Sequence, residues 1–487
     1  LRETLNTNLF KVSYKVFYNM KKFFCTLVFI LSISALIFSE DDSLGDFGFD
    51  NEESGTESSV FSIDFGGAFH TGTEVFFDVL KKPENFKPPF PLWGSLHLEA
   101  KSPLAEAYAS VNLNAKTLAI GMGETAEFFP NPLFPAWIDE AYVQALTGPV
   151  VFGGGIKKIN WGRANFLSVL DIVNPKDYSK PYEFYPEKIK KASPVFFLSA
   201  YLPKEMKLEF AYLPVFEADE FALAGRWEKN TFANITQALP SVNKALVEAK
   251  KKLFSQQAPK TNTFDYAQGG LRYSLTIGGK HDLGFQYFTG FLHEPNFKSS
   301  HKPSAPTEAE FTQVFDKAEL TYNRYHQIGA DYEAMFGQFT VQAEFAANIT
   351  ADLKGNNPDI YNPNLAWNLG LLYALPKNIN LRLQAAETVR LLNSGINQNE
   401  LSLDTEKGSP ITDSRLLFSI SQTLVRGSLE WKLNALVGIE DADFMINPEL
   451  SWLIGTIDFD LGLGFFGGKK SGKLGRYPNN HFIKILY

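Results

Sequence analysis

Cysteine is almost absent from this 487-residue chain, in which Cys25 is the only one. A disulfide within one chain needs two cysteines, so no disulfide framework holds this fold together. Long apolar runs are also missing after the first forty residues, although a transmembrane helix needs about 20 consecutive apolar residues. These two absences exclude a disulfide-stapled fold and a bundle of membrane-spanning helices for the body of the chain.

Metal-ligating and catalytic patterns are equally scarce. The seven histidines are scattered without the spacing that a metal site needs. Gly153-Gly154-Gly155 opens no helix, so it is not a phosphate-binding loop, and no nucleophile elbow occurs. We therefore expect no metal, no other cofactor and no catalytic residue, and we do not expect an enzyme.

Positive charge is in deficit. The chain has 46 Lys and Arg against 54 Asp and Glu, a net charge of −8 at pH 7. Proteins that bind nucleic acid carry basic surfaces, so we expect no nucleic-acid partner. Residues 40–59 hold eight acidic residues and neither Lys nor Arg. Low hydrophobicity with charge of one sign predicts that this segment is a disordered tail.

The amino-terminal segment has the pattern of an export signal. Met20 is followed by two lysines and then by the nearly all-apolar run 23–38, which ends at the small residue Ser39. This run is shorter than a spanning helix requires, and a basic start with a small residue at the end is typical of a secretory signal peptide. We therefore predict a signal peptide over 20–39, with residues 1–19 as sequence upstream of the true start.

Residues 60–487 are dominated by a period of two. In 379–386 the apolar residues occupy the odd positions, whereas Asn380 and Arg382 share the other face, and 429–435 divides in the same way. Strict alternation predicts strands with one face against an apolar medium and the other against water.

The connections between these strands alternate in length. Tight turns such as 101–103 and 278–280 alternate along the chain with long loops such as 161–192 and 215–263. An even-stranded outer-membrane barrel has long loops on one side and tight turns on the other, whereas a soluble sandwich has no reason to sort its loops. We therefore predict an all-β fold over residues 60–487, a transmembrane antiparallel up-and-down β-barrel of about 18 strands, with 16 as the other count. The expected strands begin near 60, 92, 105, 137, 149, 193, 206, 264, 280, 318, 336, 364, 378, 412, 427, 445, 457 and 479.

The aromatic content and the last strand agree with a membrane barrel. The chain has 44 Phe, 19 Tyr and 7 Trp, which suits aromatic girdles at the two membrane interfaces. The segment 481–487 alternates and finishes on Tyr487, which resembles the C-terminal assembly signal of bacterial outer-membrane proteins. We expect a bacterial outer-membrane location, with the lipid bilayer as one partner and the barrel-assembly machinery as another.

One stretch carries a resemblance to a known family. Trp161-Gly162-Arg163 is followed by Leu170-Asp171-Ile172-Val173-Asn174-Pro175, and Ile138-Asp139-Glu140-Ala141-Tyr142 precedes both. This order resembles a family of large porin-like bacterial outer-membrane proteins, mostly described as a domain of unknown function. The resemblance, over residues 90–350, implies an outer-membrane barrel and no particular substrate.

The loop 161–192 is the third of the long loops. In general porins, which this chain resembles in architecture, that loop folds inward and narrows the channel. A barrel of this size leaves an aqueous channel, and charged side chains across a narrow passage filter small solutes. We therefore predict a channel for passive or substrate-selective passage of small polar solutes. The expected constriction residues are Arg163, Asp171, Asn174 and Asp177, and the expected lumen-wall residues are Arg382, Glu430 and Lys432.

Two other kinds of function stay open. Phe128, Phe129, Phe134 and Phe184 lie in loops and leave room for a transporter of hydrophobic substrates such as lipids or sterols. A surface adhesin or a barrel enzyme would instead place its function on the outer loops, of which the longest carries a helix-like pattern over 240–257.

Overall fold

The structure is a computed structural model. It describes residues 61–80, 92–114, 128–129, 137–183, 185–222, 226–227, 259–299, 307, 309, 312–313, 316–357, 359–392, 411–470 and 472–487. The predicted upstream segment, signal peptide, acidic tail and helix over 240–257 lie outside these residues, as do Phe134 and Phe184.

Eighteen antiparallel strands form one closed sheet, as the alternation predicts. They are β1 (Ser62–Phe76), β2 (Leu92–Lys101), β3 (Ala105–Leu113), β5 (Ile138–Thr147), β6 (Val150–Lys157), β7 (Ser193–Leu202), β8 (Met206–Leu213), β10 (Gln268–Ile277), β11 (His281–Phe291), β14 (Arg324–Phe336), β15 (Phe339–Thr350), β16 (Asn364–Leu375), β17 (Ile379–Arg390), β18 (Thr412–Leu424), β19 (Leu429–Gly438), β20 (Asp443–Ile454), β21 (Ile457–Gly467) and β22 (Phe482–Leu486). Each strand pairs with the next one in this order, and β22 returns to β1.

The remaining elements are short and lie in the connections. They are the ribbons β4 (Phe128–Phe129) with β9 (Phe221–Ala222) and β12 (Asn296–Ser299) with β13 (Ala318–Thr321), the helices α2 (Phe77–Leu80) and α4 (Pro186–Ile189), and the 3-10 turns η2 (Phe264–Tyr266) and η3 (Val425–Gly427). In the described part of the chain, no helix has the length and apolar character needed to cross a membrane.

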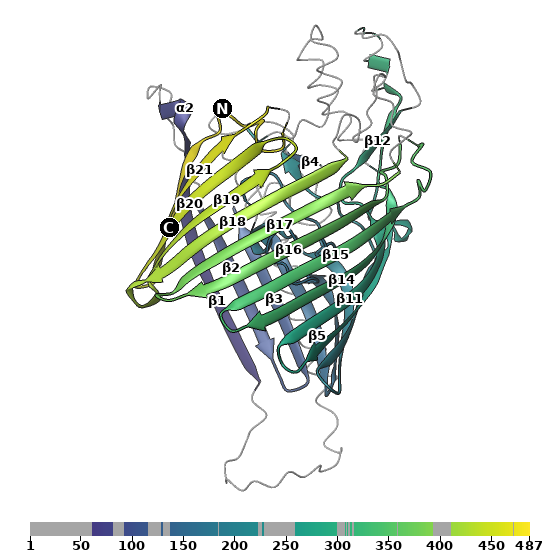
Figure 1. The fold of residues 1–487 in the computed structure, drawn as a ribbon. Helices are drawn as coiled ribbons and strands as arrows, with labels where there is room; N and C mark the ends of the chain where they lie inside the picture. Colours follow the sequence, from purple (N-terminus) through teal and green to yellow (C-terminus); the bar gives the residue numbers. More distant parts are fainter. Residues whose placement is uncertain are drawn as a thin grey trace, which may run out of the picture.

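The two ends of the barrel differ as the loop lengths predict. Tight turns join strands at one end, for example at residues 278–280, where Gly278 and Gly279 have φ angles of 60° and 63°, as a tight hairpin turn requires. The long connections, with β12 and α2, lie at the opposite end (Figure 1). The sorting of long and short connections therefore follows from the up-and-down order of the strands.

The two largest differences from the expected strand starts, at β14 and β10, each have a local reason. The strand expected near 318 is β14, which begins at Arg324, because residues 318–321 pair with β12 in a separate ribbon. The strand expected near 264 is β10, which begins at Gln268 after the 3-10 turn η2. β1 runs on to Phe76, since its last five residues pair with β22 while its first ten pair with β2.

The outer face of the sheet is apolar, and the inner face is polar. Leu383 on β17 is 44% exposed, and its cross-strand neighbours Leu371 and Phe418 are 38% and 37% exposed. The next residue, Gln384, points inward and is 3% exposed. A sheet that exposes such a band of large apolar side chains fits a hydrocarbon environment, and its closure pairs backbone groups that lipid cannot satisfy.

Candidate functional site

The connection between β6 and β7, residues 158–192, lies inside the barrel. Near its start, the amide of Asn368 on β16 donates a hydrogen bond to the carbonyl of Leu167 over 2.9 Å. Further along, the hydroxyl of Tyr185 donates to Glu449 on β20 over 2.9 Å and accepts from Asn434 on β19 over 2.7 Å. One loop therefore contacts the inner wall on several strands, and the sequence-based expectation of an inward fold is met in its position.

The first part of the loop is packed against the wall through apolar side chains. Leu170 and Val173 are fully buried, and Trp161 is 3% exposed. Trp161 meets the ring of Phe288 on β11 edge-on, with the ring centroids 6.5 Å apart. Burial of large side chains gives this segment a fixed position, since each contributes on the order of 1.5–3 kcal/mol.

The far part of the loop joins an aromatic cluster on the other side of the lumen. The ring of Tyr182 lies 4.5 Å from that of Phe482 on β22 and 5.2 Å from that of Trp227. Inward-facing Met445 and Phe466 complete this cluster and are 0% and 3% exposed. The lumen beside β20 to β22 is therefore filled by side chains at this level.

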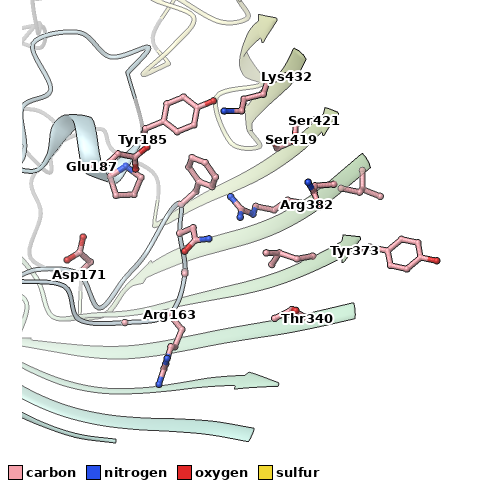
Figure 2. Close-up of a pocket in the computed structure, with 18 of the residues that line it drawn as sticks. Arg163, Asp171, Tyr185, Glu187, Thr340, Tyr373, Arg382, Ser419, Ser421 and Lys432 are labelled. Carbon is pink, nitrogen blue, oxygen red and sulfur yellow. The ribbon is translucent and has the colours of Figure 1, made fainter. Parts of the chain in front are cut away.

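A cavity of about 640 Å³ lies between the loop and the inner faces of β15 to β19 (Figure 2). The lining includes loop residues from Asn160 to Phe166 and the wall residues Thr340, Ser419 and Ser421. The register brings wall residues side by side, because Arg382 is the cross-strand partner of Ser419 and Lys432 that of Ser421. The cavity wall is thus a compact patch of hydroxyl, guanidinium and ammonium donors.

Arg382 points into this cavity, as expected for a lumen-wall residue. Its guanidinium lies 4.8 Å from the ring centroid of Phe166 in the loop. Within the described residues it forms neither a hydrogen bond nor an ion pair, and its Nε is buried. A cation stacked on an aromatic ring and without a carboxylate partner retains its capacity to bind an anion.

Lys432 and Glu430 also face the lumen, but they neutralise each other. Their charged groups are 3.0 Å apart, and both side chains are about one third exposed. The ammonium of Lys432 lies 6.0 Å from the ring centroid of Tyr185. The expected wall residues therefore come together at one side of the cavity, where Arg382 forms no ion pair within the described residues, although the charge of Glu187 in the same lining acts on it.

Arg163 borders the cavity, and its side chain points toward the neighbouring strands β11 and β14 (Figure 2). Its guanidinium lies 3.5 Å from Asp331 and 3.6 Å from Asp282. Asp331 is already held by Arg272, whose NH1 lies 2.5 Å from one of its carboxylate oxygens. Arg163 is 30% exposed at the side chain, so it lies at a wet boundary as part of a charge network.

Asp171 borders the cavity but is an internal ion-pair partner. Its carboxylate is 2.6 Å from the ammonium of Lys190, and the two side chains are 9% and 4% exposed. Lys190 also donates to Asn160 and to the carbonyl of Ile159. Burial lowers the pKa of Lys190, although Asp171 acts in the opposite direction. Lys190 thus joins the two ends of the loop, and its ion pair with Asp171 means that Asp171 presents no free negative charge.

Asn174 and Asp177 do not line the cavity. Asn174 is 1% exposed, because its amide accepts from the N–H of Ile159 and donates to the carbonyl of Lys157. Asp177 accepts from the N–H of Ser179 over 2.8 Å. Of the four expected constriction residues, the structure thus places only Asp171 and Arg163 at the cavity, because the loop uses the short polar side chains to satisfy its own backbone.

Glu344 on β15 is a site residue that sequence reasoning missed. It is 3% exposed and accepts four hydrogen bonds from the loop. Its inward orientation follows from the alternation of 339–350, which was available in the sequence. Its partner in the loop could not be predicted, because no periodic pattern relates residues 163–169 to β15.

The outer part of the loop is fixed to the segment after β8. Lys191 lies 2.8 Å from Glu217 and 3.0 Å from Glu220, and both carboxylates are buried. Burial raises the pKa of Glu220, against the effect of the Lys191 charge. The inward loop is therefore held from the wall side and from the loop-bearing end of the barrel.

Comparison with known proteins gives structural matches only. No protein-family model matches the chain, and no curated protein matches it. Among solved structures, the chain is similar to Pseudomonas aeruginosa OccK3 (OpdO), with 6% identity, a TM-score of 0.44, and 87% of this chain and 94% of that chain covered. It is also similar to Acinetobacter baumannii OccAB1, with 7% identity, a TM-score of 0.46, and coverage of 90% and 98%. A third match is Acinetobacter baumannii OccAB4, with 9% identity, a TM-score of 0.44, and coverage of 87% and 96%.

Proposed function

We propose that this chain is a bacterial outer-membrane channel for small polar solutes, in which the loop 161–192 narrows the passage. The observation that supports it most is the position of that loop inside a closed barrel, above a cavity lined by charged and hydroxyl groups. An eighteen-stranded barrel is too wide to be filled by its own wall residues, so an inward loop sets the width.

The exposed apolar band supports the membrane location. Large apolar side chains on the outer face are needed where strands meet lipid, and polar ones on the inner face where they meet water. Export through the segment 20–39 and recognition of the last strand by an assembly machinery stay predictions. The lipid bilayer and small solutes are the partners that the fold itself favours.

The cavity favours anionic solutes among the small polar ones. The lining carries more basic than acidic side chains, with Asp171 and Glu187 as its acids. Arg382 forms no ion pair within the described residues, and Ser419 and Ser421 beside it can donate hydrogen bonds to the same anion. In a confined, poorly screened space one such charge biases ion entry. A carrier of lipids or sterols would instead need an apolar pocket, so this cavity does not favour that alternative.

Ion selectivity tests the proposal. Planar-bilayer recordings of the purified protein in a salt gradient should show a reversal potential on the anion-selective side, and Arg382→Gln should shift it toward cations. Lys280→Gln, a change of equal charge in a turn outside the lumen, is the matched control and should leave the potential unchanged. Absence of ion conduction in the folded wild-type protein would contradict the channel, and an unchanged potential in Arg382→Gln would contradict the role of that residue.

A further inference from the structure

The inner wall carries a docking surface for the start of the loop, composed of residues on β10 to β16. Amide side chains of this surface donate hydrogen bonds to loop carbonyls: Gln286 to Leu170, Gln327 to Val169, Gln342 to Arg163 and Asn368 to Leu167, over 2.8 to 3.1 Å. Four successive strands thus satisfy backbone groups of one short segment. Such groups would be costly to bury without partners.

Glu344 is the acceptor at the centre of this surface. Its Oε1 accepts from the backbone N–H groups of Arg163 and Ala164, each over 2.7 Å. Its Oε2 accepts from the hydroxyl of Ser168 and the N–H of Val169, each over 2.8 Å. Within the described residues no cation pairs with this carboxylate, so its charge is stabilised by loop donors alone.

Glycines give the loop its close approach to the wall. A Cβ at Gly329 on β14 would collide with the side chain of Leu170, and a Cβ at Gly270 on β10 would lie 2.9 Å from the ring of Trp161. Gly162 has a φ of 89°, and a Cβ there would lie 2.5 Å from Oε1 of Glu344. Loop and wall therefore approach each other closely at Leu170, Trp161 and Glu344.

We infer that Glu344 is the positioning residue that fixes the loop and thereby sets the width of the passage. This inference rests on the proposed channel function. Glu344 does not touch the solute; it acts through residues 163–169, of which 163–166 border the cavity. When its bonds are lost, the loop leaves the wall at β15 and the passage widens.

Glu344→Gln is the sharpest variant, because the side chain keeps its size. Each carboxylate oxygen accepts from two donors, so an amide in either orientation turns its NH₂ group toward one pair. The hydroxyl of Ser168 can rotate and accept, but a backbone N–H cannot. At least one buried N–H of the loop is then left without an acceptor.

The control removes an inward-facing carboxylate that does not touch the loop. Glu106 on β3 faces the lumen and accepts a hydrogen bond from Gln144 over 3.1 Å. Glu106→Gln changes the lumen charge by the same amount as Glu344→Gln. A difference between the two variants therefore reports loop position and not charge.

Thiol labelling follows the loop without requiring a channel. Leu170 is fully buried in the docking surface, so Leu170→Cys should react slowly with a small thiol reagent. Adding Glu344→Gln should raise the labelling rate about tenfold, the effect of losing one hydrogen bond to a charged group. Adding Glu106→Gln should leave the rate unchanged. If Glu344→Gln does not fold, Glu344→Asp, which keeps the charge but draws it back from the loop, takes its place.

The second measurement is the single-channel conductance of the variants, and its return to the wild-type level when a disulfide holds the loop on the wall. Glu344→Gln should raise single-channel conductance, whereas Glu106→Gln should not. A disulfide between Leu170→Cys and Gly329→Cys in the Glu344→Gln background should return the conductance to the wild-type level until it is reduced. Labelling and conductance equal to those of the Glu106→Gln control would overturn the inference. If no variant and no wild-type protein conducts, the proposed function fails, while the labelling rates still decide whether Glu344 holds the loop.

Discussion

Replacing Leu383 with arginine tests which face of the sheet meets lipid. Leu383 is 44% exposed on the outer face of β17, between exposed Leu371 and Phe418 on the neighbouring strands. Toward one end of the barrel the same face carries Tyr373, stacked on Phe339 with the ring centroids 4.1 Å apart. The other end of the face carries polar groups, since Glu387 accepts from the indole N–H of Trp367 over 3.0 Å. Leu383 lies between these two interfacial levels, near the middle of the apolar band.

The expected cost of Leu383→Arg is about 2–4 kcal/mol, the penalty for a guanidinium near the bilayer midplane. That corresponds to a factor of about 30 to 1,000 in the unfolding equilibrium constant. Arg382→Leu, one residue away on the inner face, should cost about 1 kcal/mol or less, since it removes a single cation–aromatic contact. Reversible urea unfolding in lipid vesicles measures both. Equal costs for the two variants would refute the assignment of faces.

Three further predictions concern the ends of the barrel and the loop. Lys354→Cys should react with an impermeant thiol reagent on whole cells and Lys280→Cys should not, because these exposed residues lie in a long loop and a tight turn at opposite ends. Asp171→Asn should destabilise the loop by about 3–5 kcal/mol and expose it to trypsin, since it leaves the buried ammonium of Lys190 unpaired, and Lys190→Met in the same chain should restore resistance. Burial tends to raise the pKa of Glu440, but hydrogen bonds from β18 outweigh it and lower the pKa to about 2. Because this pKa is depressed in the folded state, its stabilising effect is complete above about 4.5 and is lost as the pH falls toward 2. Glu440→Gln should therefore lower stability at pH 7 and match the wild type at pH 2 in the same unfolding assay.

The barrel could be predicted from the sequence because the side chains of each strand alternate between the outer and the inner face with a period of two. In 339–350 the alternation places Phe345 outward at 48% exposure and Glu344 inward at 3%. The long and short connections then give the up-and-down order. Strands that do not belong to the barrel could not be recognised in this way. Residues 318–321, for example, form a short separate ribbon but have the same composition as a barrel strand.

The inward loop was predictable in position but not in its contacts. Asp171 and Asn174 are polar residue types that suit a channel surface. In the structure, however, Asp171 forms an ion pair with Lys190, and Asn174 accepts a hydrogen bond from the backbone N–H of Ile159. The loop brings these partners together by an irregular backbone path. Because it has no repeating pattern, the sequence does not predict which side chains meet. Conversely, Arg382 was predictable as a lumen residue because its orientation follows from the parity of β17 alone.

Single-channel recording of a loop deletion shows whether the inward loop narrows the passage. Removing residues 164–177 eliminates the segment that docks on Glu344 and leaves the strands β6 and β7 intact. Recorded in planar bilayers beside the wild-type protein, the deletion variant should conduct more ions per channel and lose its preference for anions, because the wall charge at Arg382 then faces a wide, screened lumen. A folded deletion variant with the conductance and selectivity of the wild type would contradict the account.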